Sequence, residues 1–191
     1  MRQENKEFLK RIIDKFPNNF RDPILEIGSF RVEGQEDFAN LRELFPGKKF
    51  VGVDMREGLG VDRVENVHSL RIPSNSVGSV ICIDTLEHVE NIEKAMSEMY
   101  RVLRPGGIIV IVSVMNFPIH DYPSDYWRFT PECFKKLLKR FDNVIVEFDG
   151  DEKFPTGIYG AGIKTKRYSA IHEIYVKSIY NFKNYLLRKP L

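Results

Sequence analysis

PILEIGSFRVEG, residues 23–34, combines a short apolar run with a glycine that ends it abruptly. Ile24, Leu25 and Ile27 predict a buried strand that stops at Gly28, and apolar residues at 38, 41, 44 and 45 predict a helix after it. A strand, a glycine-containing turn and a helix are typical of the first unit of a doubly wound α/β domain. Such domains bind ligands above the carboxyl ends of their strands.

Glu26 places a carboxylate inside this apolar strand, two residues before the glycine. A buried charge is costly unless something pairs with it. A pyrophosphate cofactor is anionic and would be repelled here, whereas a positively charged ligand would be attracted. The alternative is that Glu26 only pairs with Arg31 or with a helix N-terminus.

A second strand is predicted at KFVGVD, residues 49–54, and it ends in Asp54. An acid at this point is placed to accept hydrogen bonds from a ribose diol. The two strands together indicate a cationic nucleoside cofactor. S-adenosylmethionine fits, because it carries an ammonium, a sulfonium and an adenosine ribose. The alternative is that Asp54 is only a turn residue, and the loop after Gly28 lacks the full dinucleotide-binding glycine pattern.

The remaining periodicity predicts an α/β fold. Strands are expected near residues 63–66, 79–83, 108–114 and 143–148, with 157–164 returning as a hairpin partner. Helices are expected at residues 4–16, at 92–102, and from the N-cap Thr130 to about 139. Strands that alternate with helices indicate a mostly parallel sheet with right-handed crossovers.

Composition predicts a soluble protein of the cytoplasm. The chain has 191 residues, of which 42% are hydrophobic and 29% charged, and a net charge of +2 that implies no strongly polyanionic partner. We find no apolar run of membrane-spanning length and no signal-peptide core. Cys82 and Cys133 have no metal-ligand spacing, so they are expected to be buried free thiols, and no metal site is predicted.

The C-terminal segment differs from the rest in charge. Residues 161–191 contain seven lysines or arginines and one acid, Glu173. We therefore divide the chain into a cofactor-binding domain over residues 1–165 and a basic amphipathic helix over residues 166–191. That helix is expected to pack on the domain or to form a homodimer contact; the alternative is that it lies on an anionic membrane surface.

Four stretches resemble the class I S-adenosylmethionine-dependent methyltransferases over residues 20–165. They are LEIGS at 25–29, VGVD at 51–54, ICIDTLEHV at 81–89 and RVLRPGGIIVIVS at 101–113. DMREGLGVD at 54–62 and SDYWRFTPE at 124–132 are similar to a bacterial and archaeal subgroup of often unassigned substrate, some of it linked to surface-glycan assembly. The resemblance implies a Rossmann-like sheet of seven strands with an antiparallel C-terminal hairpin strand.

The resemblance also implies how the first two strands hold S-adenosylmethionine. Gly28 would let the backbone approach the methionine part, with Ser29 beside it, and Glu26 would help to hold the ammonium. Asp54 would accept the ribose hydroxyls, and Met55 would lie beside the adenine.

Further cofactor residues are implied by the later motifs. Asn66, flanked by Val67, stands where the family often has an acid for the adenine amino group, and an amide can still accept that hydrogen bond. Asp84 and Thr85 would line the methionine side.

Two histidines are candidates for a general base. The cofactor supplies an activated methyl group, so the protein mainly has to position a nucleophile and, for a hydroxyl, remove its proton. His120 is favoured over His88 because its loop follows a strand at the expected active edge. The alternatives are that His88 only braces the next helix and that His120 is a solvated loop residue.

An aromatic, proline-containing loop is the predicted acceptor wall. Tyr122, Tyr126 and Trp127 would form its surface, and Arg128 would pair with an acidic group of the acceptor. The alternative is that Trp127 and Phe129 only pack the loop onto the sheet.

The predicted function is methyl transfer to oxygen or nitrogen of a small-molecule or glycan acceptor. A nicotinamide-dependent dehydrogenase is disfavoured by Glu26 and by the missing glycines. A non-catalytic protein that retains the fold and docks on a membrane or partner is the remaining alternative. Nucleic acid is not expected as a substrate, because Asp84 and Thr85 stand where the family's element for base amino groups would be.

Overall fold

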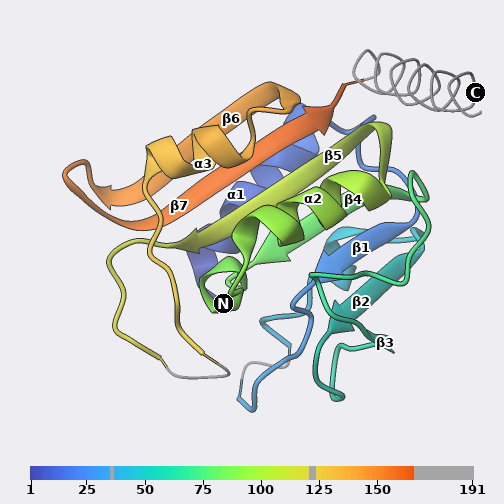
Figure 1. Ribbon diagram of the computed structural model, residues 1–191, viewed down its shortest axis with the longest axis horizontal. Helices are drawn as coiled ribbons and strands as arrows, with labels where there is room; N and C mark the ends of the chain where they lie inside the picture. The colour runs from blue at the N-terminus through green and yellow to red at the C-terminus, as the bar shows by residue number, and fades with distance from the viewer. Residues whose placement is uncertain (35–36, 121–123, 166–191) are drawn as a thin grey trace, which may run out of the picture.

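A seven-stranded sheet forms the centre of the computed structural model, which describes residues 1–34, 37–120 and 124–165 (Figure 1). The strands are β1 Ile24–Ile27, β2 Phe50–Asp54, β3 Arg63–Val64, β4 Val77–Ile83, β5 Leu103–Val114, β6 Phe141–Asp151 and β7 Phe154–Lys164. The α-helices are α1 Gln3–Lys15, α2 Ile92–Val102 and α3 Pro131–Leu137, and the 3-10 turns are η1 Arg42–Leu44 and η2 Leu86–His88.

The strand order is β3-β2-β1-β4-β5-β7-β6. β1, β2, β3, β4 and β5 pair in parallel, and β7 is antiparallel to both of its neighbours, β5 and β6. The predicted α/β class, the mostly parallel sheet and the antiparallel hairpin strand are therefore confirmed. The chain leaves β1 toward β2 and β3 and returns on the other side of β1 as β4, so the sheet reverses its winding between β1 and β4.

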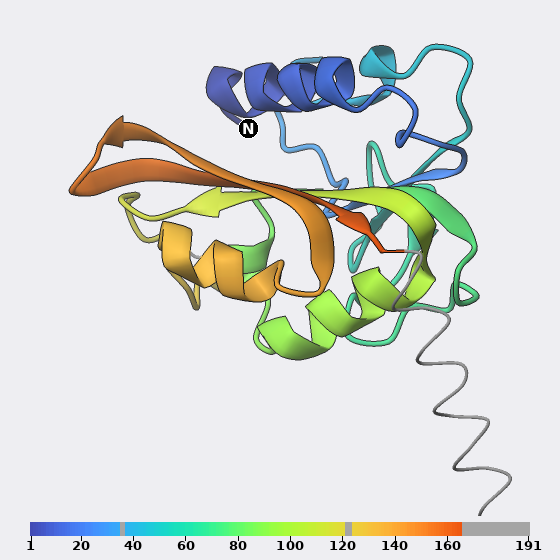
Figure 2. The same ribbon diagram turned by 90° about the horizontal axis from the view of Figure 1, so that it is seen from above.

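The sheet buries apolar side chains on both faces, because helices cover both (Figure 2). One face packs Leu25, Val80 and Ile109 against Met99 of α2 and Phe134 of α3. The other face has a separate core under α1, formed by Phe8, Leu9, Ile12, Ile24, Ile81, Ile108 and Val110. The near-continuous apolar runs of β4 and β5 follow from this double covering.

The prediction of a helix after β1 is wrong for the residues that the structure describes. A loop occupies this region and ends in the single turn η1. Leu41 and Phe45 are buried in the same core as Phe8 and Phe20, while Phe38 remains 37% exposed. The apolar spacing arises because two loop side chains fill the edge of a core that α1 already covers.

Caps fix the predicted starts of the two later helices. Asn91 accepts a 2.9 Å hydrogen bond from the Lys94 amide before α2, and Thr130 accepts one of 3.2 Å from the Cys133 amide before α3. The predicted basic helix lies outside the described residues. No helix within the described ranges is long and apolar enough to cross a membrane.

Gly28 ends β1 with a backbone that other residues rarely adopt. Its φ is +78°, and a Cβ at this position would lie 2.0 Å from Thr85 Oγ1 and 2.9 Å from Thr85 Cβ. The absence of a side chain therefore lets the turn after β1 contact the turn after β4.

We predict that Gly28→Ala lowers the free energy of unfolding more than Gly47→Ala. Gly47 has a similar φ of +74° but open space around it, so its substitution carries only the backbone penalty of about 1 kcal/mol. Overpacking against Thr85 should add about 2 kcal/mol to that penalty in Gly28→Ala. Urea denaturation of both variants measures the difference, and equal losses would contradict the predicted contact.

Candidate functional site

A cleft of about 740 Å³ opens at the carboxyl ends of β1, β2 and β4. This is the point where the sheet reverses its winding and where ligands bind in open α/β sheets. The cleft is lined by every cofactor residue that the sequence predicts, namely Glu26, Gly28, Ser29, Asp54, Met55, Asn66, Val67, Asp84 and Thr85. Its volume lies within the range of small-molecule sites.

Glu26 is buried in the cleft wall at 7% exposure. Burial raises the pKa of its carboxyl to about 8, although the charges of Arg31 and Arg42 act in the opposite direction. Among the described residues no hydrogen bond or ion pair engages this carboxylate. The alternative of a pair with Arg31 is therefore not formed; Arg31 donates instead to the Asn40 side chain over 2.7 Å.

Asp84 adopts a strained backbone at the end of β4, with a φ of +47°. Asn5 of α1 donates a 2.7 Å hydrogen bond to Oδ2, whereas Oδ1 is buried with no hydrogen-bond partner among the described residues. Burial raises the pKa of this carboxyl as well. The first helix thus orients an acid of the cleft, a role that its sequence did not indicate.

Glu87 is a further buried carboxylate of the cleft and was given no role from the sequence. It is 1% exposed, and burial together with the nearby charge of Asp84 raises its pKa to about 7. Ser113 of β5 donates a 2.7 Å hydrogen bond to Oε2. Its position four residues after β4, within the LEHV motif, was the local signal, but that motif does not reveal the contact with Ser113.

Asp54 forms an ion pair inside the cleft. Its Oδ1 accepts hydrogen bonds of 3.0 Å from the backbone amide and from Nε of Arg56, and the Arg56 guanidinium lies over the Phe30 ring. Asp54 therefore has both a turn role and a position on the cleft wall. A ribose diol would have to displace the Arg56 side chain, so the predicted ribose contact stays a prediction.

The part of the cleft that the sequence predicts for the adenine is open. Met55 is 60% exposed, and the Asn66 side-chain oxygen accepts a 2.8 Å hydrogen bond from the His68 amide. Deeper in the cleft, Ser29 Oγ is buried without a hydrogen-bond partner among the described residues. The Thr85 hydroxyl donates to the Ile83 carbonyl over 2.8 Å, which leaves this side chain a mainly structural role.

His88 and His120 meet at the far side of the cleft. Their ring centroids are 4.6 Å apart at an angle of 85°. Nδ1 of His88 lies 2.7 Å from the Ser124 carbonyl oxygen, so His88 braces the acceptor loop rather than the following helix. His120 lines the cleft and also contacts the Phe117 ring, so it is held by neighbours and is not a freely solvated residue.

Asp125 holds the acceptor loop together. Its carboxylate accepts a 2.9 Å hydrogen bond from the His120 amide and forms an ion pair with Arg128 through two hydrogen bonds. The ion pair with Arg128 keeps the pKa of Asp125 well below the usual range. Arg128 also donates to the carbonyls of Phe117 and Pro118. In these contacts Arg128 shapes the loop, and its predicted role in binding an acceptor stays a prediction.

The predicted aromatic wall is only partly assembled in the described residues. Tyr126 lines the cleft and is 50% exposed. Trp127 donates from Nε1 to the Val89 carbonyl over 2.8 Å and does not line the cleft, and Phe129 is buried against Phe134. Loop packing therefore accounts for Trp127 and Phe129, and Tyr122 lies outside the described residues.

Solved structures share this architecture. A methyltransferase described as S-adenosylmethionine-dependent, from Archaeoglobus fulgidus, matches with a TM-score of 0.59 and 18% identity, over 83% of this chain and 94% of that one. Phosphoethanolamine N-methyltransferase 2 from Haemonchus contortus, solved with S-adenosyl-L-methionine, matches with a TM-score of 0.61 and 16% identity, over 85% of this chain and 52% of that one. At these identities the likeness concerns the fold.

A family model described as a methyltransferase domain matches residues 35–111. In this segment the chain is similar to methyltransferase domains, and its sheet order is similar to that of the S-adenosylmethionine-dependent methyltransferase from Archaeoglobus fulgidus. The first strand with Glu26 and Gly28 lies before the matched segment.

Two curated relatives are named for quinone biosynthesis. The ubiquinone/menaquinone biosynthesis C-methyltransferase UbiE of Brucella canis is 30% identical over 109 residues, which cover 53% of this chain and 40% of the relative. The demethylmenaquinone methyltransferase of Bacteroides fragilis is 29% identical over 128 residues, which cover 56% of this chain and 52% of the relative. The chain thus spans about half the length of these relatives.

We predict that Glu26→Gln weakens the binding of S-adenosylhomocysteine at least tenfold at pH 8.5, about 1.4 kcal/mol, because the ligand's ammonium loses a charged partner. Adenosine lacks the amino-acid part, so its affinity should change less than twofold. Titration calorimetry with both ligands makes this comparison, and Glu152→Gln on the exposed β6–β7 turn is the control. An equal loss for adenosine would contradict the assigned role.

We also predict that Glu26→Gln loses less thermal stability than the wild-type protein when the pH is raised from 5 to 8.5. The native carboxyl binds its proton up to a pKa of about 8, above its ordinary value of 4.5. The native state thus holds more protons than the unfolded state between these values, and stability decreases as pH rises through them. The variant should lack this component of the decrease in a melting series from pH 5 to pH 8.5, while Glu152→Gln should retain it.

Proposed function

We propose that this protein transfers the methyl group of S-adenosylmethionine to a small-molecule acceptor. The observation that carries the proposal is a cleft lined by the buried carboxylate of Glu26 and the partly buried one of Asp84. Among the described residues the only ion pair that either forms is the one between Asp84 Oδ2 and the N-terminal ammonium of Met1, 3.9 Å away. Glu26 has no partner among the described residues, and Asp84 Oδ1 is buried without a hydrogen bond. A ligand with an ammonium and a sulfonium supplies the missing positive charge.

The residues of the cleft fit this cofactor. Glu26 and Asp84 flank Gly28 at the ends of adjacent strands, so they would hold the amino-acid part of the cofactor. Met55 and Val67 would cover the adenine, and Asp54 would accept the ribose hydroxyls after release from Arg56. When bound, the cofactor supplies the activated methyl group, and the protein supplies orientation and exclusion of water.

The acceptor side of the cleft favours a partly apolar molecule with a hydroxyl group. Phe117, Val114 and Tyr126 line it beside the polar cluster of Glu87 and the two histidines. A polyhydroxylated glycan would need more hydrogen-bonding groups than these side chains offer. Of the acceptors that the sequence suggested, a small molecule methylated on oxygen therefore fits better than a glycan or an amine.

Carbon is a second candidate for the methylated atom. The names of the Brucella and Bacteroides relatives refer to C-methylation in quinone biosynthesis and to demethylmenaquinone. A ring carbon next to an ionised hydroxyl is nucleophilic, so a base that serves O-methylation can also serve this reaction. We therefore include a reduced quinone among the proposed acceptors.

We expect cofactor-stripped protein to bind S-adenosylmethionine and S-adenosylhomocysteine at one site per chain with micromolar or tighter affinity. Titration calorimetry at pH 8 measures both. NADH is the control ligand, because its pyrophosphate would meet the acids of the cleft, and it should not bind. Absence of binding for both sulfur-containing ligands would overturn the proposed function.

For the acceptor, we expect methyl-labelled cofactor to label a catechol or a reduced naphthoquinone but not a hexose. Product mass and proton spectra distinguish a methoxy group from a methyl group on carbon. Labelling of the hexose alone would return the assignment to a glycan acceptor.

A further inference from the structure

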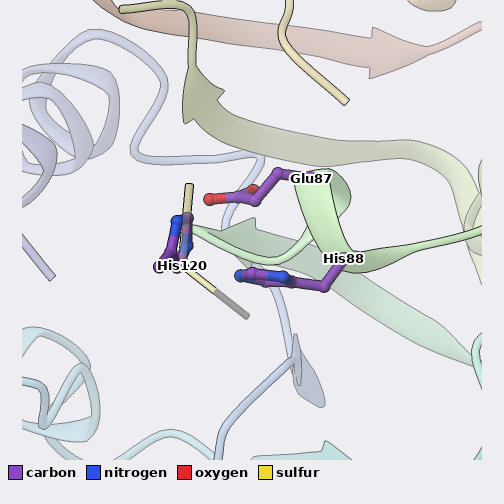
Figure 3. A group of neighbouring side chains, drawn as sticks. All are labelled: Glu87, His88 and His120. Atoms are coloured by element: carbon purple, nitrogen blue, oxygen red, sulfur yellow. The ribbon is translucent and has the colours of Figure 1, made fainter. Parts of the chain in front are cut away.

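Three side chains that can ligate a metal converge at the acceptor side of the cleft. Glu87 and His88 project from η2, and His120 projects from the loop after β5 (Figure 3). Each offers one ligand atom, and these atoms all lie within 4.8 Å of one another. The three residues come from two segments of the chain, so sequence spacing did not reveal them.

Polar contacts at Nδ1 hold both imidazoles in place. Nδ1 of His88 lies 2.7 Å from the Ser124 carbonyl oxygen, and Nδ1 of His120 lies 3.1 Å from the Pro118 carbonyl oxygen and 3.3 Å from Asp125 Oδ2. An imidazole that donates its Nδ1 proton to oxygen presents the lone pair of Nε2. Metal-ligating histidines in proteins are oriented by this type of hydrogen bond.

Glu87 is oriented as well. The Ser113 hydroxyl donates to its Oε2 over 2.7 Å, and the side chain is 1% exposed. A buried carboxylate without a neutralising partner is costly, and a cation would remove that cost. In the described part of the chain Glu87 has no ion pair.

We infer that Glu87, His88 and His120 bind one divalent transition-metal ion. Two imidazole nitrogens and one carboxylate suit zinc, cobalt, nickel or iron, whereas magnesium prefers oxygen ligands. Ligands of one ion at bond lengths of about 2.1 Å lie about 3–4 Å apart, so the three atoms must approach by about 1 Å. The His120 side chain is 38% exposed and can make this adjustment.

The role of this ion rests on the proposed function, and the ion extends that function by binding the acceptor. Three protein ligands leave open positions, and the ion would face the part of the cleft lined by Phe117 and Tyr126. A hydroxyl oxygen of the acceptor would occupy such a position, and the ion would lower the pKa of that hydroxyl. The acceptor class is therefore a molecule whose hydroxyl both binds the ion and becomes ionised.

The test is titration of metal-stripped, full-length protein with two ions. Visible absorption monitors the binding of Co²⁺, and calorimetry monitors the binding of Zn²⁺. We expect one ion per chain. His120→Ala and Glu87→Gln should each weaken Co²⁺ binding at least tenfold. His68→Ala, which removes a histidine outside the cluster, should change it less than twofold. Because Glu87 is buried, His120→Ala on the exposed loop keeps the test valid if Glu87→Gln fails to fold.

The outcomes separate this inference from the proposed function. If S-adenosylhomocysteine binds and neither metal does, or if His68→Ala costs as much affinity as His120→Ala, the metal site is wrong and the proposed function stands. If the cluster binds metal and neither S-adenosylhomocysteine nor S-adenosylmethionine binds, the site stands and the methyltransferase proposal fails. Catechol added to the Co²⁺ form should shift its visible bands; an unchanged spectrum would overturn the acceptor assignment.

Discussion

The desolvation of carboxylates at one edge of the sheet is the constraint that shapes this cleft. Glu65, another buried acid that lines the cleft, is neutralised within the chain: Arg63 and Arg71 pair with it, and its pKa is lowered. Within residues 1–34, 37–120 and 124–165 no arginine pairs with Glu26 or Glu87, and burial raises the pKa of both. Within one cleft the chain thus neutralises one buried acid and leaves two others with raised pKa values, and such perturbed acids are typical of functional sites.

Sheet topology explains why these acids share a cleft although they are far apart in sequence. Parallel strands end at the same edge, so the residues after β1, β2 and β4 meet there. The antiparallel hairpin of β6 and β7 extends the sheet away from this edge. α1 contributes from the other side: Asn5 orients Asp84, and Arg2 reaches Asp149 of β6 over 2.9 Å. Met1 and Arg2, which directly precede α1, line the cleft, and the helix itself covers the core and orients Asp84 through Asn5.

The strands and the cofactor edge could be predicted from the sequence because both depend on local patterns. Apolar runs located the strands, and Glu26, Gly28 and Asp54 stand at their ends. The predicted helix after β1 failed because Leu41 and Phe45 satisfy the same spacing from a loop. Glu87 received no role because its neighbours His120 and Ser113 come from distant segments, and local patterns contain no information about such contacts.

The Arg56–Asp54 pair is compatible with a ribose-binding role for Asp54. The two residues are neighbours in a turn, and the arginine is partly exposed, so the pair contributes at most about 1 kcal/mol. A ribose diol that donates two hydrogen bonds to the carboxylate can offset this loss. Glu26 differs, because no arginine competes for it among the described residues. In the proposed complex Asp54 would exchange Arg56 for the ribose, whereas Glu26 would gain a charged partner from the ligand.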